Sequence, residues 1–218
     1  MSLVLHGAPV SPFVRKVRIA LVEKNVPHEL VPVVPFPPAN ATPEFRRMSP
    51  LGKIPAISDG DFAISDSSVI CAWLERRHPT PLLYPSDAND FARALWFEEH
   101  ADSRLLEAIG PVFFQRFVRK LVFGQEPDEA IVRKALDEAL PPALDYLEGQ
   151  LDGVEWLVGG RFTIADVATA SMLQQLRHAG ETVDAGRWPR LAAYAERALA
   201  RPSFKTCLAD ETKGLPPR

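Results

Sequence analysis

Residues 49–79 read SPLGKIPAISDGDFAISDSSVICAWLERRHP, and this stretch decides the fold of the first part of the chain. Two short apolar pieces, Ala56–Ser58 and Phe62–Ile64, flank an Asp-Gly-Asp turn, which is typical of a β-hairpin. Asp66 or Ser67 can then cap a following helix. The residues that we expect this helix to bury are Val69, Ile70, Trp73 and Leu74.

A strand, a helix and a second strand are predicted upstream of the hairpin. Residues 2–6 are short and apolar, and Gly7 ends them. Ser11-Pro12 opens a helix, because serine caps free N–H groups and proline suits the first helical position. The stretch from His28 to Val34 contains Pro32, which predicts a strand at the sheet edge. This order of elements predicts a small α/β layer domain.

The helix opened by Ser11-Pro12 has an apolar stripe that predicts its buried face. The residues of this stripe are Phe13, Val17, Ala20 and Leu21. Three basic residues, Arg15, Lys16 and Arg18, lie mostly off it.

The rest of the chain predicts helices only. Helical patterns run over residues 87–123, with a bend at Gly110-Pro111, and over 128–151, with a kink at Pro141-Pro142. Thr163-Ile-Ala-Asp166 resembles a capping box and opens a helix that is apolar on most sides, which indicates burial. Another helix is expected from Pro189 to about residue 200.

Composition excludes several classes of protein. The 218 residues carry 25 Lys and Arg and 28 Asp and Glu, a net charge of −3 that argues against nucleic-acid binding. We expect no membrane span, because no run of about 18 apolar residues occurs, and no signal peptide at the N-terminus. Cys71 and Cys207 form no disulfide framework, which favours a reducing, cytoplasmic setting, and Cys71 is expected to be buried. The histidines lack metal-ligand spacing, so no metal is expected.

Three short segments carry possible binding chemistry. Ser11 stands at a predicted helix N-terminus, which favours an anion such as a thiolate, although a simple cap is the more common role of such a serine. Ile54 precedes Pro55; a cis bond there would let an extended peptide pair with Ile54, whereas trans is the common state. Asp66 and Ser67 can bind an amino-acid head group; the alternative is that they do no more than cap their helix.

Together these segments resemble the glutathione S-transferase family. The matching stretches are residues 11–18 (SPFVRKVR), 49–57 (SPLGKIPAI), 64–70 (ISDSSVI), 162–166 (FTIAD) and 201–204 (RPSF). The resemblance covers nearly the whole chain in the right order. It implies an α/β thioredoxin-like N-terminal domain at residues 1–80 and an all-α helical C-terminal domain at 86–211, together the glutathione S-transferase fold.

The resemblance also implies a site, a co-substrate and an assembly. Glutathione would bind the first domain, with Ser11 hydrogen-bonded to its sulfur, Ile54 before a cis Pro55 paired with the cysteinyl backbone, and Lys53 near a carboxylate. Asp66 and Ser67 would hold the γ-glutamyl head; Asp66 stands where many members have Glu. The implied protein is a cytoplasmic, detoxifying homodimer that conjugates a small hydrophobic electrophile.

The residue at the active-site loop narrows the subclass. No tyrosine precedes Tyr84 and no cysteine lies in the loop of Val10 and Ser11, so tyrosine-type and cysteine-type members fit poorly. The Ser-Ser-Cys-like run usual in isomerase-type members is also absent. The chain is therefore similar to serine-type members, broadly theta- or tau-like.

Apolar residues are candidates for the acceptor site, with core packing as the alternative for each. They are Val10, Phe13, Phe36, Phe113, Phe114 and Phe117. The leading function is glutathione conjugation. The same site would also suit a glutathione-dependent peroxidase, dehalogenase or isomerase, and a non-catalytic ligand-binding or interaction protein of this fold remains a further alternative.

Overall fold

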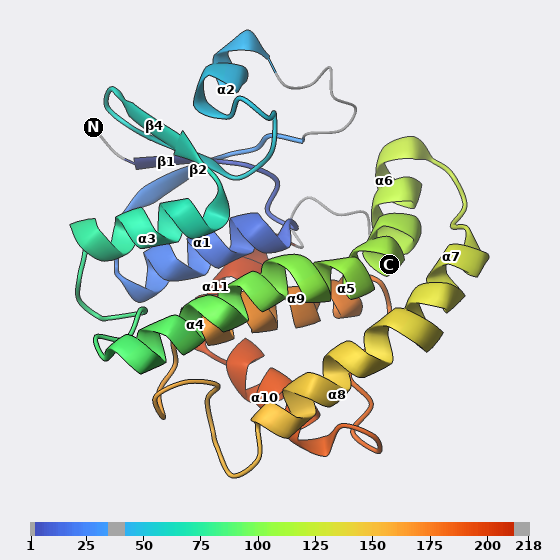
Figure 1. The fold of residues 1–218 in the computed structure, drawn as a ribbon. Helices are drawn as coiled ribbons and strands as arrows, with labels where there is room; N and C mark the ends of the chain where they lie inside the picture. Colours follow the sequence, from blue (N-terminus) through green and yellow to red (C-terminus); the bar gives the residue numbers. More distant parts are fainter. Residues whose placement is uncertain (1–2, 35–41, 212–218) are drawn as a thin grey trace. The chain divides into compact units, whose positions relative to one another are not determined.

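The computed structural model describes residues 3–34 and 42–211, which fall into two compact units (Figure 1). The first unit is formed by Met1–Leu83 and Arg201–Arg218, and the second by Tyr84–Ala200. The C-terminal helix α11, Pro202–Glu211, thus belongs to the first unit and packs against its helix α1, Pro12–Glu23. The domain boundaries inferred from the sequence differ here, because they assign residues 201–211 to the helical domain.

A four-stranded mixed sheet forms the centre of the first unit. Its strands are β1 Leu3–His6, β2 His28–Val31, β3 Ala56–Asp59 and β4 Phe62–Ser65, in the order β2-β1-β3-β4. β1 pairs parallel with β2 and antiparallel with β3, and β3–β4 is the predicted hairpin. The predicted edge strand is confirmed: β2 lies at the edge and ends before Pro32.

Helices α1 and α3, Ser67–Arg77, pack against each other beside this sheet, and α2 spans Pro43–Met48. The expectation that α3 buries Val69 is wrong, since this side chain is 44% exposed. The buried face of α3 is formed instead by Ile70, Cys71 and Leu74, so the burial expected for Cys71 is confirmed.

The basic residues beside the apolar stripe of α1 are buried, which its periodicity did not indicate. Arg15, Lys16 and Arg18 are 0%, 1% and 5% exposed. Each has a polar partner from another helix: Lys16 Nζ donates to Ser68 Oγ of α3 at 2.9 Å, and the two arginines pair with acidic residues of α11. A charged side chain is stable in the interior when it is paired in this way.

The second unit is helical, as predicted. Its elements are α4 Ala88–His100, η2 Ala101–Leu105, α5 Leu106–Phe113, η3 Phe114–Val118, α6 Arg119–Phe123, α7 Glu129–Lys134, η4 Ala135–Ala139, α8 Leu140–Gln150, α9 Ile164–His178 and α10 Pro189–Leu199. The η elements are π-helical turns, so α4 to α6 and α7 to α8 are two long, continuous helices. Pro111 lies within α5, just before the second of these turns.

The predicted capping box at the start of α9 is confirmed, and its acidic residue is a hub of hydrogen bonds. The Asp166 carboxylate accepts from the backbone N–H of Thr163 at 2.8 Å and of Leu157 at 3.1 Å. It also accepts from the hydroxyl of Tyr194 on α10 at 3.1 Å. Asp166 is fully buried, so it joins the preceding loop, α9 and α10 inside the second unit.

The stability of the protein should depend on the charge of Asp166. Burial raises the pKa of this carboxyl from 3.8 to about 6, although its donors act in the opposite direction. Between these values the native state binds a proton that the unfolded chain has lost, so the stability from this residue falls as pH rises.

We predict that Asp166→Asn destabilises the protein by about 1–3 kcal/mol, because an amide N–H₂ faces donors in place of an acceptor. The difference from wild type in urea denaturation should be larger near about pH 4.5 than near about pH 7.5. A difference that grows with pH would show that the hydrogen bonds outweigh the burial.

Candidate active site

Three segments of the first unit meet at the turn between β1 and α1. A Cβ on Gly7, which follows β1, would lie 2.4 Å from Val14 Cγ2 and 3.4 Å from Ile54 Cβ. The backbone of this turn therefore packs directly against α1 and against the segment before β3. The Asp66 N–H donates to the Pro55 carbonyl at 3.3 Å and joins this segment to the start of α3.

Ser11 is the N-cap of α1, as the capping alternative predicted, but it holds its helix weakly. Its Oγ accepts from the Val14 N–H at 3.5 Å, a distance at the limit of a hydrogen bond. The first turn of α1 contains no acidic residue, so no carboxylate of that turn offsets the positive end of the helix dipole. The half-buried hydroxyl can therefore donate to an anion that also faces this helix end.

The Ile54–Pro55 peptide bond is cis, as predicted. Ile54 is half-buried and stands just before β3. Within residues 3–34 and 42–211, neither its N–H nor its carbonyl has a hydrogen-bond partner. An extended peptide can pair with both groups. The adjacent Lys53 is exposed, and its carbonyl accepts from the buried Ser49 hydroxyl at 2.7 Å.

Asp66 and Ser67 form the N-terminus of α3. Asp66 has φ +83°, a conformation that is costly for a residue other than glycine and that clusters at functional sites. Its Oδ1 accepts from the N–H groups of Ser68 and Val69 at 3.0 and 3.1 Å, so it caps the helix, while the residue remains exposed. Ser67 is 4% exposed, and its hydroxyl finds no partner among the described residues.

The place of two residues next to this site was not predicted from the sequence. Gly7 was interpreted only as the end of a strand, although a glycine between a strand and a helix can signal a close approach of backbone. Lys16 was placed off the apolar stripe, yet its buried ammonium group lies under the start of α3, bonded to Ser68. No local sequence pattern predicts that contact, because it joins residues of two different helices.

The arrangement suits an extended, partly anionic peptide. Two helix N-termini, at Ser11 and at Ser67, offer backbone N–H groups and positive dipole ends. Between them in sequence, Ile54 offers one backbone donor and one acceptor. Asp66 adds the carboxylate that an ammonium group requires.

The acceptor candidates are divided between the two units. Val10 and Phe13, in the first unit, are half-buried, and Phe36 lies outside the described residues. In the second unit the rings of Phe113 and Phe117 stack with centroids 4.9 Å apart, and both contact the His178 ring.

Phe114 does not join this pair; it is 37% exposed and contacts Phe123. Phe113 also packs on the buried cluster of Val112, Val132, Ala135 and Ala179, as the core-packing alternative predicted. The structure therefore brings together only two of the three helical candidates.

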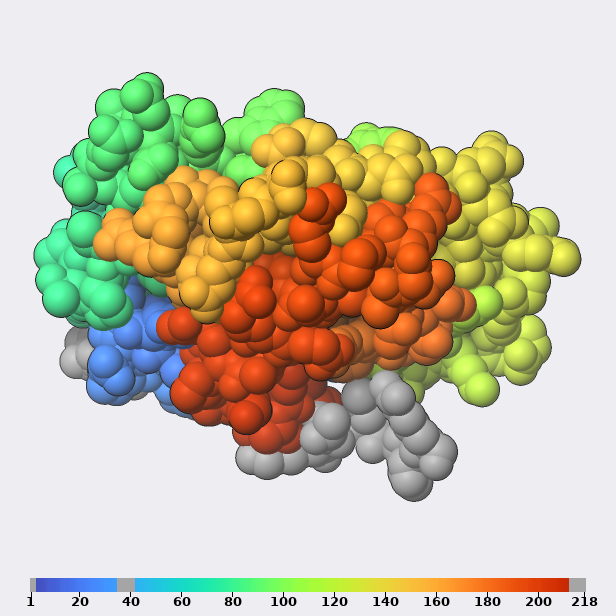
Figure 2. All heavy atoms as spheres, turned by 90° about the horizontal axis from the view of Figure 1, so that it is seen from below, coloured from blue at the N-terminus to red at the C-terminus, as the bar shows by residue number. Residues whose placement is uncertain are grey.

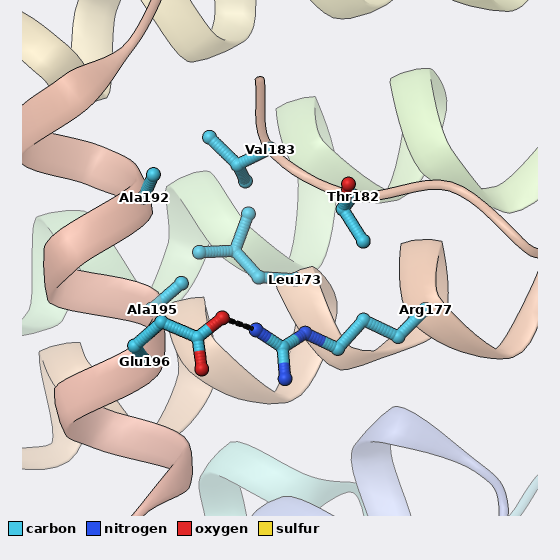
Figure 3. Close-up of a pocket in the computed structure, with 7 residues that line it drawn as sticks. All are labelled: Leu173, Arg177, Thr182, Val183, Ala192, Ala195 and Glu196. Atoms are coloured by element: carbon cyan, nitrogen blue, oxygen red, sulfur yellow. Dashed lines mark hydrogen bonds and ion pairs between the residues drawn. The ribbon is translucent and has the colours of Figure 1, made fainter. Parts of the chain in front are cut away.

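A pocket in the second unit is a poor candidate for this chemistry. It is lined by Leu173, Arg177, Thr182, Val183, Ala192, Ala195 and Glu196. Figure 3 shows Arg177 and Glu196 paired across it, and its volume of about 30 Å³ admits water but no tripeptide. The described residues contain no cluster of three His, Cys, Asp or Glu suited to a metal, and none of their helices is long and apolar enough to cross a membrane.

Comparison with known proteins identifies the family to which the chain belongs. Residues 5–82 match the model of the glutathione S-transferase N-terminal domain, and residues 96–197 match that of its C-terminal domain. The chain belongs to the glutathione S-transferase family. It is 34% identical over 212 residues to Glutathione S-transferase 3 of Zea mays, which covers 95% of this chain and 93% of that one.

Two further proteins to which this chain is similar differ in name. The structure of a glutathione S-transferase-I bound with lactoylglutathione matches with TM-score 0.86 and 26% identity, covering 96% of this chain and 99% of the other. FtsZ-localized protein A of Caulobacter vibrioides is 29% identical over 224 residues, with 98% and 93% covered. The plant relatives are phi-type-like, whereas the sequence analysis compared the chain with theta- and tau-like members.

The close approach at Gly7 gives a prediction for stability. Gly7→Ala should cost roughly 1–3 kcal/mol, because the new methyl group overlaps Val14. The double variant Gly7→Ala/Val14→Ala should recover part of this loss, as the smaller side chain makes room. Gly149→Ala, in α8 and with nothing within 4 Å, is the control and should be neutral or stabilising. Equal urea midpoints for both single variants would contradict the packing described here.

Proposed function

We propose that this glutathione S-transferase family member conjugates glutathione, and that the Ser11 hydroxyl holds the glutathione sulfur as a thiolate. The position of Ser11 carries the proposal: a half-buried hydroxyl, weakly engaged as a cap, at a helix end without acidic residues. The thiolate would attack an electrophilic carbon of an apolar acceptor. A sulfur–carbon bond forms, and either a leaving group departs or the acceptor takes up a proton.

The rest of the tripeptide would be held by the other two segments. Ile54 would pair with the cysteinyl backbone, and the exposed Lys53 would reach a carboxylate of glutathione. Asp66 would bind the γ-glutamyl ammonium, while Ser67 and the N-terminus of α3 bind its carboxylate. The relative whose structure contains lactoylglutathione supports glutathione as the ligand class.

Activation of the thiol is the chemical step that the protein must assist. A free thiol has a pKa of about 8.5, so only a few per cent is ionised at neutral pH. A donated hydrogen bond and a helix N-terminus both stabilise the anion and lower this pKa. Holding the thiolate next to the acceptor adds to the rate by proximity.

The acceptor would be small and apolar. We propose that it contacts Val10 and Phe13, the half-buried apolar residues near Ser11 in the sequence of the first unit. Apolar pockets discriminate weakly between related molecules, which suits an enzyme of broad, detoxifying range. Cys71 and Cys207 are both buried and lie far apart in the sequence, which supports a reducing, cytoplasmic setting.

A second candidate function is a non-catalytic interaction protein of the same fold. The observation that favours it is the similarity, over 98% of this chain, to a protein named for localisation with FtsZ. A panel of electrophiles and hydroperoxides distinguishes the candidates. Turnover of electrophiles supports conjugation, turnover of hydroperoxides a peroxidase, and binding of glutathione without turnover the interaction protein.

The first prediction from this proposal concerns Ser11→Ala. The variant should lose roughly ten- to a hundred-fold in rate at neutral pH, since a hydrogen bond to a charged group contributes about 1.5–3 kcal/mol. The loss should shrink as pH rises, because glutathione then ionises unaided. Glutathione affinity should change less than the rate, as the tripeptide keeps its other contacts.

The control for Ser11→Ala is Asp87→Ala, which removes the N-cap of α4. Asp87→Ala should lose about 0.5–2 kcal/mol of stability, and Ser11→Ala, which removes a weaker cap, should lose about 0.5 kcal/mol. Only Ser11→Ala should alter the pH–rate profile. A wild-type profile in Ser11→Ala would leave Ser11 as a cap and nothing more.

The second prediction concerns assembly. We propose a two-fold symmetric homodimer, the commonest arrangement of soluble oligomers. Light scattering at micromolar concentration should then give twice the chain mass of 24.1 kDa. A mass near that of one chain would contradict it.

A further inference from the structure

Three ion pairs in the first unit join α1 to α11 and to Arg201, the residue just before α11. They are Glu23–Arg201 at 3.0 Å, Arg18–Asp210 at 2.5 Å and Arg15–Glu211 at 2.6 Å. Figure 2 shows the red spheres of α11 directly beside the blue spheres of the N-terminal part of the chain. The order of the pairs makes the two helices antiparallel, so the end of α11 lies at the Ser11 end of α1.

The pair nearest to Ser11 is also the most buried. The side chains of Arg15 and Glu211 are both 0% exposed. Arg15 Nε and Nη2 donate to the two carboxylate oxygens at 2.6 and 2.7 Å, a bidentate geometry that fixes the guanidinium plane. By contrast, the Asp210 side chain of the middle pair is 38% exposed.

Arg15 carries this constraint into the turn that holds Ser11. Its Nη2 also donates to the carbonyl of Val10 at 3.3 Å, and its backbone N–H donates to the Ser11 carbonyl at 2.9 Å. One side chain thus fixes the peptide unit that joins Val10 to Ser11. Glu211 orients that side chain. Glu211 therefore influences the turn that holds Ser11, although it lies 196 positions from Arg15 in the sequence.

We infer that Glu211 is a positioning residue for Ser11 and acts through Arg15. Without the carboxylate, the buried guanidinium loses the partner that sets its plane, and the Val10 carbonyl loses a fixed donor. The Ser11 hydroxyl then samples orientations that do not face the bound sulfur. This inference rests on the proposed role of Ser11, but its structural half, the ordering of the turn, can be measured independently of any reaction.

The test compares two matched variants, Glu211→Gln and Glu23→Gln. Each removes the charge of a glutamate that pairs with an arginine between α1 and α11, and only Glu211 leads to Ser11. In Glu211→Gln, amide hydrogen exchange at residues 8–14 should accelerate at least several-fold. The thiolate fraction of bound glutathione, followed by ultraviolet titration at neutral pH, should fall several-fold. Glu23→Gln should keep the wild-type values of both.

A double variant distinguishes loss of the ion pair from a general loss of folding stability. Replacing both partners of a buried ion pair by apolar residues is often neutral for folding, so Arg15→Met/Glu211→Leu should fold and still show fast exchange and poor ionisation. Wild-type exchange in this variant or in Glu211→Gln would overturn the inference. Altered exchange with unchanged thiol ionisation would overturn it too.

Failure of the proposed function gives a different result. If the wild-type protein does not ionise bound glutathione, the proposed chemistry of Ser11 fails, and the exchange rates alone decide whether Glu211 orders the turn.

Discussion

The packing of Gly7 against Val14 and Ile54 is the contact on which the candidate site depends. It lets the turn after β1 lie against α1 and against the segment before β3 at distances that no side chain on residue 7 would permit. The Asp66–Pro55 backbone hydrogen bond then adds the start of α3. Residues that are remote in sequence, Ser11 and Asp66 among them, are brought to one region of the first unit by backbone contacts.

The electrostatics of this region favour an anion. Helices α1 and α3 both present N-termini there, and α1 has no acidic residue in its first turn. Below them lie the buried cations Arg15 and Lys16, of which Arg15 is neutralised by Glu211 and Lys16 is bonded to Ser68. Burial strengthens such interactions because the local dielectric constant is low. The same features that stabilise the fold therefore suit a thiolate and a carboxylate.

Features decided by neighbouring residues could be predicted from the sequence. The caps at Ser11 and Asp66, the hairpin and the capping box at Thr163 each depend on a few adjacent side chains. The burial of Arg15 could not be predicted, because Glu211, which pairs with it, is 196 positions away. The inclusion of α11 in the first compact unit could not be predicted for the same reason. Phe113 and Phe117, four positions apart, stack as helical spacing allows, whereas Phe114 follows Phe113 directly and contacts Phe123.

The claim that Ser11 activates the glutathione sulfur is tested most directly by a crystal structure of the protein with glutathione bound. The account predicts that the sulfur lies within about 3.5 Å of Ser11 Oγ, at the N-terminus of α1. It also predicts the cysteinyl backbone beside Ile54 and the γ-glutamyl group at Asp66 and Ser67. A complex in which the sulfur faces another donor, or in which glutathione binds away from these segments, would contradict it.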